Sequence, residues 1–258
     1  MCSTRILVAT HKHYEFPKSE IYIPIQVGKS NSLLDLGITV DNTGENISAK
    51  NSSFCELTAL YWAWKNHFFH TMEYVGLVHY RRYFTGHTVS IKGKYILGEE
   101  EIAKLLENAD CIVPKKRNYY IETVYSHYKN AHYIQDLEQV KSIVLAKNPD
   151  YLTACSQVMN SKTLHLFNMF IMKKSLFEQY CEWLFPILFE LENRIDISAY
   201  DQYQKRVFGF IAERLFNVWI VHNNIRTVQV KVVNLEKEKL YLKVFNLLKR
   251  KFLNNEKK

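Results

Sequence analysis

The sequence is short of the residues that make tight turns and of those that make disulfide frameworks. It contains 8 Gly and 5 Pro in 258 residues, which argues against a β-sandwich rich in tight turns and against long flexible linkers. Its 5 Cys are an odd number, are scattered, and include no Cys-x-x-Cys pair. We therefore expect reduced thiols in a cytosolic protein.

Long apolar runs and a secretory leader are missing as well. No segment approaches the roughly 18 uninterrupted apolar residues of a membrane-spanning helix. The N-terminal residues lack both the basic start and the long apolar stretch of a secretory signal. From these absences we expect a cytoplasmic protein without a transmembrane helix.

Several catalytic signatures are absent. The chain has no P-loop, no Gly-x-Gly-x-x-Gly, no Gly-x-Ser-x-Gly and no His-Glu-x-x-His. An NTPase, a dinucleotide-binding enzyme, an α/β-hydrolase and a zinc protease therefore lack support. No Asp-x-Asp occurs either. His11 and His13 lie close together, but no third ligand follows at a useful spacing, so we expect no metal site.

What the sequence does contain is ample apolar material and an uneven charge. Hydrophobic residues make up 47% and aromatic residues 14%, enough for a large core. The net charge is +8, but residues 231–258 hold nine Lys or Arg and three Glu, so the preceding 230 residues carry only +2. Because this body is nearly neutral and has no recognition motif, we expect no nucleic-acid partner.

Strand-like and helix-like patterns alternate along the chain, as in α/β folds. Strands are predicted over residues 5–10, 21–27, 74–78, 110–114, 164–172 and 228–233. Helices are predicted from Ser53, where Ser53 and Glu56 fit a capping box, and over residues 99–108, 132–147, 175–193 (bent or broken near Pro186) and 203–221. Residues 118–133 are crowded with Tyr and His and are expected to be partly loop. No repeat or internal boundary is evident, which favours one domain over residues 1–235 and a tail over 236–258.

The tail combines apolar and basic residues at helical spacing. Over residues 237–253, several apolar side chains share one side and Lys and Arg flank them: Leu240, Tyr241, Val244, Leu247 and Leu248 form the apolar side. A basic amphipathic helix of this kind suits the anionic inner face of the cytoplasmic membrane. Packing on the core with a solvated basic edge is the alternative.

The most informative stretch is the one that follows Glu73. A short apolar strand, Tyr74–Val78, ends abruptly in His79, Tyr80, Arg81 and Arg82. Ligands of open α/β sheets sit at the carboxyl ends of strands, and adjacent guanidinium forks suit diphosphate or carboxylate oxygens. A surface ion-pair cluster beside a turn is the alternative for an isolated Arg pair.

Long ordered motifs make the chain resemble one bacterial family. The segments that carry the resemblance are Ile6–Lys12, Asp41–Ser48, Phe54–Asn66, Gly76–Phe84, Asn168–Met172 and Arg206–Leu215. The family was long catalogued only as a domain of unknown function. Its members occur in capsule, exopolysaccharide and O-antigen clusters and are treated as glycosyltransferases, some of them galactofuranosyltransferases. The resemblance runs from about residue 5 to about residue 230.

The resemblance implies a GT-A-like α/β fold, a mostly parallel sheet flanked by helices with a nucleotide-binding N-terminal half. Thr10, His11 and Lys12 would then follow the first strand, where a nucleotide base and ribose lie. Asp41, Asn46 and the helix start at Asn51 would surround the ribose or diphosphate, with helix capping alone as the alternative. Tyr80 and Asn168 would contact substrate, Asn168 because it interrupts the predicted strand 164–172. Tyr125, His127, Tyr128 and His132 are candidates for stacking on sugars.

Most GT-A enzymes hold a divalent metal with Asp-x-Asp at the end of the strand that matches Tyr74–Val78. In this sequence, basic residues occupy the position of the Asp-x-Asp. The hypothesis is that Arg81 and Arg82, with His79 as a further donor, neutralise the diphosphate without a metal. An inverting transferase also needs a carboxylate base. Glu213, an acid in an apolar helix, is the candidate, unless it only forms a surface pair with Arg214; Asp201 is the second candidate, and Glu56 is explained by its cap.

The sequence therefore predicts a cytoplasmic glycosyltransferase that is peripheral at the inner face of the membrane. It would transfer a hexose, galactofuranose or galactose for preference, from a UDP-sugar to a lipid-linked oligosaccharide, and it would need neither a metal nor another cofactor. A retaining transferase on the same fold is one alternative. A non-catalytic nucleotide- or polysaccharide-binding subunit is another.

Overall fold

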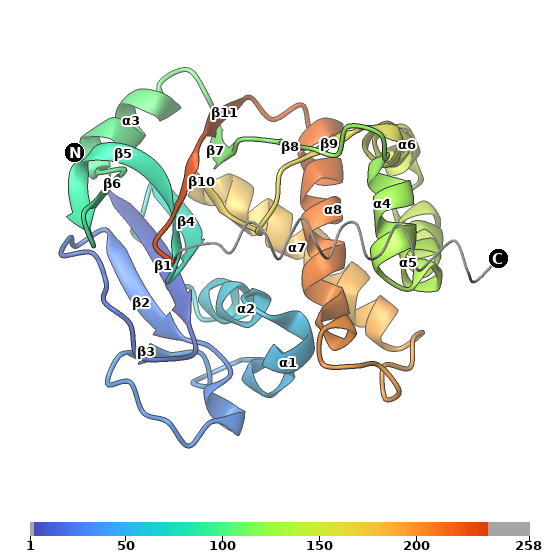
Figure 1. Cartoon of the computed structure of the whole chain (residues 1–258), viewed down its shortest axis with the longest axis horizontal. Coiled ribbons are helices and arrows are strands. Elements are labelled where there is room, and N and C mark those ends of the chain that lie inside the picture. The colour runs from blue at the N-terminus through green and yellow to red at the C-terminus, as the bar shows by residue number, and fades with distance from the viewer. Residues whose placement is uncertain (1–2, 237–258) are drawn as a thin grey trace.

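The computed structural model describes residues 3–236, and their centre is a mostly parallel sheet (Figure 1). Its strand order is β11-β7-β10-β4-β1-β2-β3. These strands are β1 (Thr4–Thr10), β2 (Tyr22–Gln26), β3 (Thr39–Val40), β4 (Tyr74–His79), β7 (Cys111–Pro114), β10 (Phe170–Lys173) and β11 (Thr227–Val230). Neighbours run parallel except at β10, which is antiparallel to both β4 and β7. The predicted fold class, a mostly parallel sheet flanked by helices, is confirmed.

A group of antiparallel strands extends the sheet from the end of β4. It consists of β5 (Arg82–Ile91), β6 (Lys94–Ile96) and β12 (Val232–Asn234), and β5 joins β4 only at the pair His79 and Arg82. The single strand predicted over residues 228–233 is therefore wrong, since β11 and β12 flank residue 231 and pair with different strands. A separate two-stranded sheet joins β8 (Arg117–Asn118) to β9 (Thr163–Leu164).

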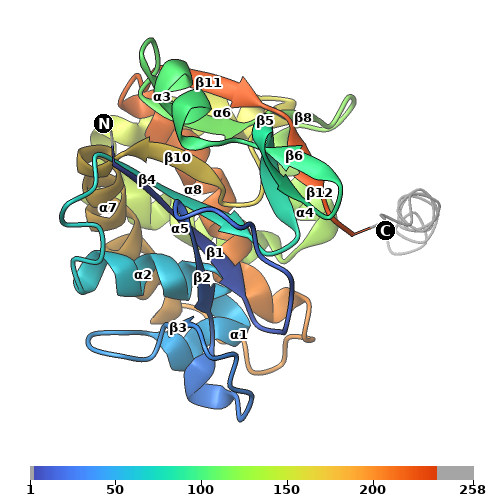
Figure 2. The same cartoon turned by 90° about the vertical axis from the view of Figure 1, so that its left-hand side faces the viewer.

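Helices cover both faces of the sheet, as two views of the chain show (Figures 1 and 2). Leu7 and Ala9 of β1 pack with one set of helices, whereas Ile6 and Val8 pack with α3 and the β5–β6 hairpin. Because alternate side chains of a strand point to opposite faces, β1 is apolar throughout. The helices are α1 (Asn51–Phe54), α2 (Leu57–Lys65), α3 (Glu99–Leu106), α4 (Val124–Ala131), α5 (Ile134–Lys147), α6 (Leu152–Asn160), α7 (Lys174–Glu192) and α8 (Val207–His222).

The helix predicted from Ser53 is two helices with a corner between them. The backbone of Cys55 has φ 54°, which ends α1 and starts α2 at a new angle. The predicted capping box is wrong, because the Ser53 hydroxyl donates to the Lys50 carbonyl and Glu56, the N-cap of α2, makes no side-chain cap. The carboxylate of Glu56 is therefore available for another role.

The strand predicted over residues 164–172 is also two elements. Residues between β9 and β10 form a turn in which Phe167 has φ 80° and Asn168 has φ 50°. Residues 118–133, expected to be partly loop, contain α4, whose start is capped by Thr123. The helix α7 runs through Pro186 without a break.

The predicted tail, apart from Glu236, lies outside the described residues. Whether it forms a basic amphipathic helix stays a prediction, as does the boundary at residue 236. Within residues 3–236, none of the helices has the length and apolarity needed to cross a membrane.

Candidate active site

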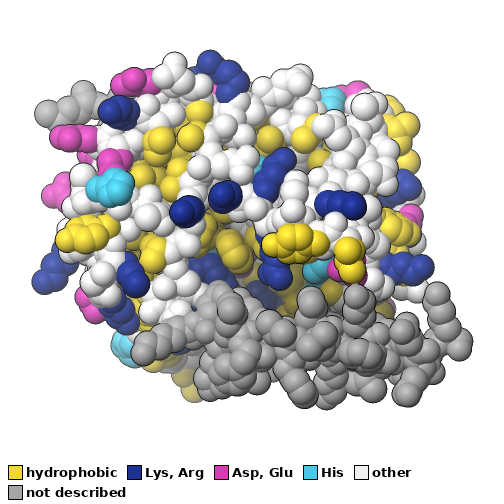
Figure 3. All heavy atoms as spheres, turned by 45° about the horizontal axis from the view of Figure 1, so that its top comes forward, with side chains coloured by type: hydrophobic (Ala, Val, Ile, Leu, Met, Phe, Trp, Pro, Cys, Tyr) yellow, Lys and Arg dark blue, Asp and Glu magenta, His cyan; other side chains and the backbone are white. Residues whose placement is uncertain are grey.

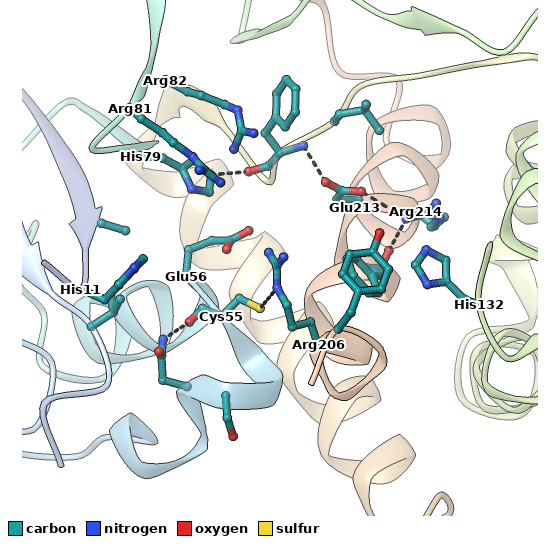
Figure 4. A pocket seen from close by; sticks show the side chains of 18 of the residues that line it. His11, Cys55, Glu56, His79, Arg81, Arg82, His132, Arg206, Glu213 and Arg214 are labelled. Carbon is teal, nitrogen blue, oxygen red and sulfur yellow. Dashed lines mark hydrogen bonds and ion pairs between the residues drawn. The ribbon is translucent and has the colours of Figure 1, made fainter. Parts of the chain in front are cut away.

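A pocket of about 620 Å³ opens at the carboxyl ends of β1, β2 and β4 and faces the first turns of α8. Ala9 lies near the end of β1 and His11 follows that strand, while Val27 follows β2. His79 ends β4, and residues 80–82 come directly after it. This is the edge at which parallel sheets gather their ligands. Figure 4 shows side chains from β4, from the α1–α2 corner and from α8 converging on it.

Arginine dominates the charge of this pocket. Its lining includes five Arg and two Glu: Arg81, Arg82, Arg117, Arg206, Arg214, Glu56 and Glu213. On the face shown in Figure 3, most Lys and Arg side chains are separated by uncharged surface. A concave site with an excess of guanidinium groups suits an anionic ligand, and phosphate oxygens match the guanidinium fork best.

Arg81 and Arg82 both reach the pocket, as predicted. The Nη1 atom of Arg81 lies 3.1 Å from a carboxylate oxygen of Glu236. The guanidinium of Arg82 lies 4.6 Å from the centre of the Phe167 ring. The sequence-based grouping of these cations at one strand end is confirmed, while their contact with a diphosphate stays a prediction.

His79 lines the same pocket, but its geometry argues against the predicted role as a further donor to the diphosphate. Its Nε2 donates to the carbonyl of Phe167 over 2.7 Å. Burial lowers the pKa of His79 below its ordinary value, so the ring is neutral near pH 7 and its one N–H is used by Phe167. The correction is that His79 fixes the turn at Phe167 and contributes no positive charge to the pocket.

The residues after β1 divide between the pocket and its margin. His11 lines the pocket with its ring edge-on to Tyr80, 5.5 Å between centres, and Tyr80 lines it too. Burial, followed by the neighbouring positive charges, lowers the pKa of His11. Thr10 is buried and bonds the backbone of Lys12, and Lys12 points to Glu236, 3.2 Å away. Neither Thr10 nor Lys12 lines the pocket.

The loop 41–48 is not part of the pocket, contrary to the prediction. Asp41 is fully buried and accepts hydrogen bonds from the Gly28 amide at 2.8 Å, from Thr58 at 2.7 Å and from Ser48. Asn46 bonds backbone groups of its own loop. These polar groups hold the loop in shape. Asn51 alone of the predicted set in this region lines the pocket, with its amide donating to the Cys55 carbonyl.

The turn at Phe167 and Asn168 contacts several pocket residues and helps to fix their positions. The Phe167 carbonyl accepts from His79, its ring lies beneath Arg82, and its amide donates to Glu213 over 2.8 Å. Asn168 does not line the pocket, contrary to the prediction; it is buried and donates to Glu56 over 2.7 Å. Positive φ at a residue as bulky as Phe is strained, and such strain persists where surrounding contacts fix it.

Glu213 lies in the pocket as predicted, and both of its carboxylate oxygens have partners. One accepts from the Phe167 amide and the other lies 3.1 Å from Nη1 of Arg214, which is 3% exposed. Burial raises the pKa of Glu213, and the Arg214 charge and the Phe167 amide act against the rise. The alternative of a surface pair is wrong, since the pair is internal. Asp201, the second predicted base, is exposed and bonds the Gln204 amide outside the pocket.

With this geometry in place, the chain can be compared with known proteins. Residues 5–224 match the family described as "Domain of unknown function (DUF4422)". The chain belongs to this family. Among solved structures it is similar to a WbbM bifunctional glycosyltransferase in its apo form, with 34% sequence identity and a TM-score of 0.84. The match covers 92% of this chain and 46% of the other, so the chain spans less than half of that protein's length. No curated protein matches.

In this DUF4422 protein, several pocket residues escape sequence reasoning. Glu56 was explained by a capping box that does not form. Arg206 precedes α8, and its Nε donates to the Cys55 sulfur at 3.3 Å. It begins one of the segments that carry the family resemblance, but no role for it followed from the sequence. An aromatic wall faces the strand ends and consists of Tyr119, His127, His132, Tyr203 and Phe210. Of the stacking candidates, His127 and His132 belong to this wall, whereas Tyr128 is core and Tyr125 lines a separate cavity.

The part of the chain that the structure describes offers no set of side chains that could hold a metal ion. Residues 3–236 contain no group of three or more His, Cys, Asp or Glu side chains placed to hold an ion. The two pocket carboxylates, Glu56 and Glu213, stand among Arg side chains. Metal-independent transfer stays a prediction that chelation tests.

Proposed function

We propose that this protein is a glycosyltransferase of bacterial surface-polysaccharide synthesis that transfers a hexose, galactofuranose or galactose for preference, from a UDP-sugar. The observation that carries the proposal is the arginine-lined pocket at the carboxyl ends of β1, β2 and β4. It occurs in a chain that is similar over 92% of its length to a bifunctional glycosyltransferase. A sugar nucleotide has both features that such a pocket accommodates, a diphosphate and a polar ring.

The diphosphate of the donor would lie against Arg81, Arg82 and Arg206. Charge develops on the diphosphate oxygen as the sugar leaves, and fixed guanidinium groups stabilise that charge best when water is excluded. Arg206 supports this assignment because it is exposed within the pocket and stands at the N-terminal end of α8, where the helix dipole favours an anion. On this proposal the transferase works without a divalent metal.

The two sides of the pocket would take different parts of the substrates. His11, Tyr80 and Asn51 lie on the strand side, where a nucleotide base and ribose would bind. Tyr119, His132 and other members of the aromatic wall lie on the opposite side, where apolar ring faces suit an acceptor sugar. The reaction would be inverting, with one carboxylate taking the proton of the acceptor hydroxyl.

The acceptor would be a lipid-linked oligosaccharide, and the basic tail over 236–258 would hold the enzyme at the inner leaflet. The composition of the tail supports this part of the proposal. Deleting residues 237–258 should move the protein from the membrane fraction to the soluble fraction. An unchanged distribution would contradict the anchoring role and leave the transferase role untouched.

A thermal-shift screen of the full chain tests the proposal. UDP, GDP, CMP, dTDP and their common sugar conjugates are each added with EDTA and with manganese. Stabilisation by UDP species that survives EDTA is the expected result. Stabilisation only with manganese would overturn metal independence, and no stabilisation by any nucleotide would overturn the transferase role.

Two alternatives on the same fold are separable by product analysis. A retaining transferase would give the opposite anomeric configuration, which NMR of the product reports. A non-catalytic binding subunit would not release UDP from a UDP-sugar even over long incubation. Slow UDP release by the purified protein is what the proposal expects.

A further inference from the structure

Two carboxylates reach the pocket, and they differ in what already holds them. Glu213 has a partner at each oxygen, the Phe167 amide and the buried Arg214. Glu56 is held at one oxygen only, which accepts from Nδ2 of Asn168 over 2.7 Å. Its other oxygen accepts no hydrogen bond from any of the residues 3–236, so one side of this carboxylate is open to a ligand.

The backbone aims Glu56 into the pocket at a local cost. Cys55 adopts φ 54° and ψ −135°, a region that residues with a side chain rarely occupy. This corner separates α1 from α2 and places Glu56 as the first residue before α2 instead of inside a continuous helix. In Figure 4 the side chain of Glu56 points toward the middle of the pocket, between Arg81 and Arg206.

The residue that holds Glu56 is itself well fixed. Asn168 has φ 50° and is 5% exposed, and its Nδ2 also donates to the Gly209 carbonyl at 3.1 Å. Two acceptors for one amide nitrogen fix which way the amide faces, so Nδ2 and not Oδ1 meets Glu56. The corner at Cys55 and the fixed amide of Asn168 therefore both position the Glu56 carboxylate.

Resting on the proposed function, we propose that Glu56 is the catalytic base and that Asn168 is its positioning residue. The acceptor hydroxyl oxygen forms the new bond to the anomeric carbon, and its proton passes to the open oxygen of Glu56. The bond from the anomeric carbon to the diphosphate breaks, and its electron pair leaves with the nucleoside diphosphate. Glu56 then returns its proton to solvent. Glu213, predicted as the base from sequence, instead holds the Phe167 turn in place.

The groups that face Glu56 come from several elements. They are His79 on β4, Arg81 after it, Arg206 before α8, Glu213 on α8, Cys55 beside it and Tyr180 on α7. Of these, burial leaves His79 neutral near pH 7, and it raises the pKa of the Cys55 thiol to about 12. Near neutral pH, the positive charges that Glu56 faces are thus those of Arg81 and Arg206, and the negative one is that of Glu213.

The test is the Glu56→Gln variant of the full chain, assayed by UDP release from UDP-galactose and from UDP-galactofuranose. The replacement side chain has nearly the same shape and its amide oxygen still accepts from Asn168, so folding and UDP binding should persist. We expect kcat to fall by about 10²- to 10⁴-fold, KM to change little, and the loss of rate at acidic pH to disappear. Glu56→Asp should keep that acidic loss at a reduced kcat. Glu100→Gln, on the exposed surface of α3, is the matched control.

The outcomes separate the inference from the function on which it rests. If the wild type releases UDP and Glu56→Gln does so at a similar rate with an unchanged pH profile, Glu56 is not the base. If kcat is kept and only KM rises, Glu56 binds substrate and the inference is also overturned. If the wild type releases no UDP from either donor while binding it, the proposed transferase function fails and takes the inference with it.

Discussion

The two sides of the pocket are built in different ways. The strand side consists of Ala9, His11 and residues 79–82, at the ends of the paired parallel strands β1 and β4, and none of these residues has positive φ. The other part, called here the turn side, consists of the Phe167–Asn168 turn, of which Phe167 lines the pocket, and of the corner at Cys55; all three residues have positive φ. This protein thus presents Arg81 and Arg82 from ordinary strand ends, whereas it positions the Glu56 carboxylate through turns with positive φ.

On the strand side of the pocket, the largest effect on activity should come from Arg82. Replacing Arg82 by Ala removes a guanidinium that the proposal places on the donor diphosphate. We expect kcat/KM for UDP-galactose to fall by about 10²- to 10³-fold, measured as UDP release. Arg82→Lys should fall between the two, because an ammonium lacks the planar fork. A wild-type rate in Arg82→Ala would show that Arg82 does not bind the donor diphosphate. The strand side would then lose one of the cations that distinguish it from the turn side.

On the turn side, the largest effect of pH on the free energy of unfolding should come from His165. His165 begins the segment that leads to Phe167; it is buried, its Nδ1 donates to the Pro114 carbonyl, and burial lowers its pKa to about 4. Since the unfolded chain takes up the proton more readily, this contribution is complete above about pH 6.5 and is lost as the pH falls through 4. The loss is about 3 kcal/mol in the free energy of unfolding.

Urea unfolding of the wild type and of His165→Gln at pH 7 and pH 4 measures this contribution. The variant should be less stable than the wild type at pH 7 and should lose less stability on acidification. An equal loss in both proteins would show that the acid sensitivity lies elsewhere, and would weaken the contrast between the two sides.

Strain at the corner should be visible in a matched pair of variants at Cys55. Gly adopts positive φ without a steric penalty, whereas Ala keeps the strain that Cys has. We expect Cys55→Gly to be more stable than Cys55→Ala by about 1 kcal/mol in urea unfolding. Both variants lose the sulfur that accepts from Arg206, so this contact cancels in the comparison. The reverse order would mean that the corner is unstrained.

The smallest effect should come from Glu236, which pairs with both Arg81 and Lys12 at the margin of the strand side. These pairs are partly exposed, and such pairs contribute at most about 1 kcal/mol. Glu236→Gln should therefore raise the affinity for UDP by about two- to fivefold, measured by calorimetry, with a larger gain at low salt. A loss of affinity would indicate that Glu236 orders the cations and does not compete for them.

Sequence reasoning recovered what depends on local pattern. The apolar strands β1 and β4, the polar cluster that ends β4, and the acid Glu213 within an apolar helix were all placed correctly. Residues whose role depends on distant partners were not. Asp41 and Asn46 resembled ligand contacts because a buried loop and a binding loop use the same polar residue types. Glu56 resembled a cap because its spacing from Ser53 fits one.

The alternation of strands and helices and the position of two arginines at a strand end can be read from residue order alone, because apolar periodicity and strand length are local properties. Which acids face the pocket cannot be read in this way and follows from how the folded chain is packed. That choice depends on the backbone turns at Cys55 and Phe167–Asn168, which are held by contacts from residues such as Arg206, His79 and Gly209, far away in the sequence. Strained conformations of this kind have no signature in residue type, since the contacts that stabilise them form only when the chain is folded.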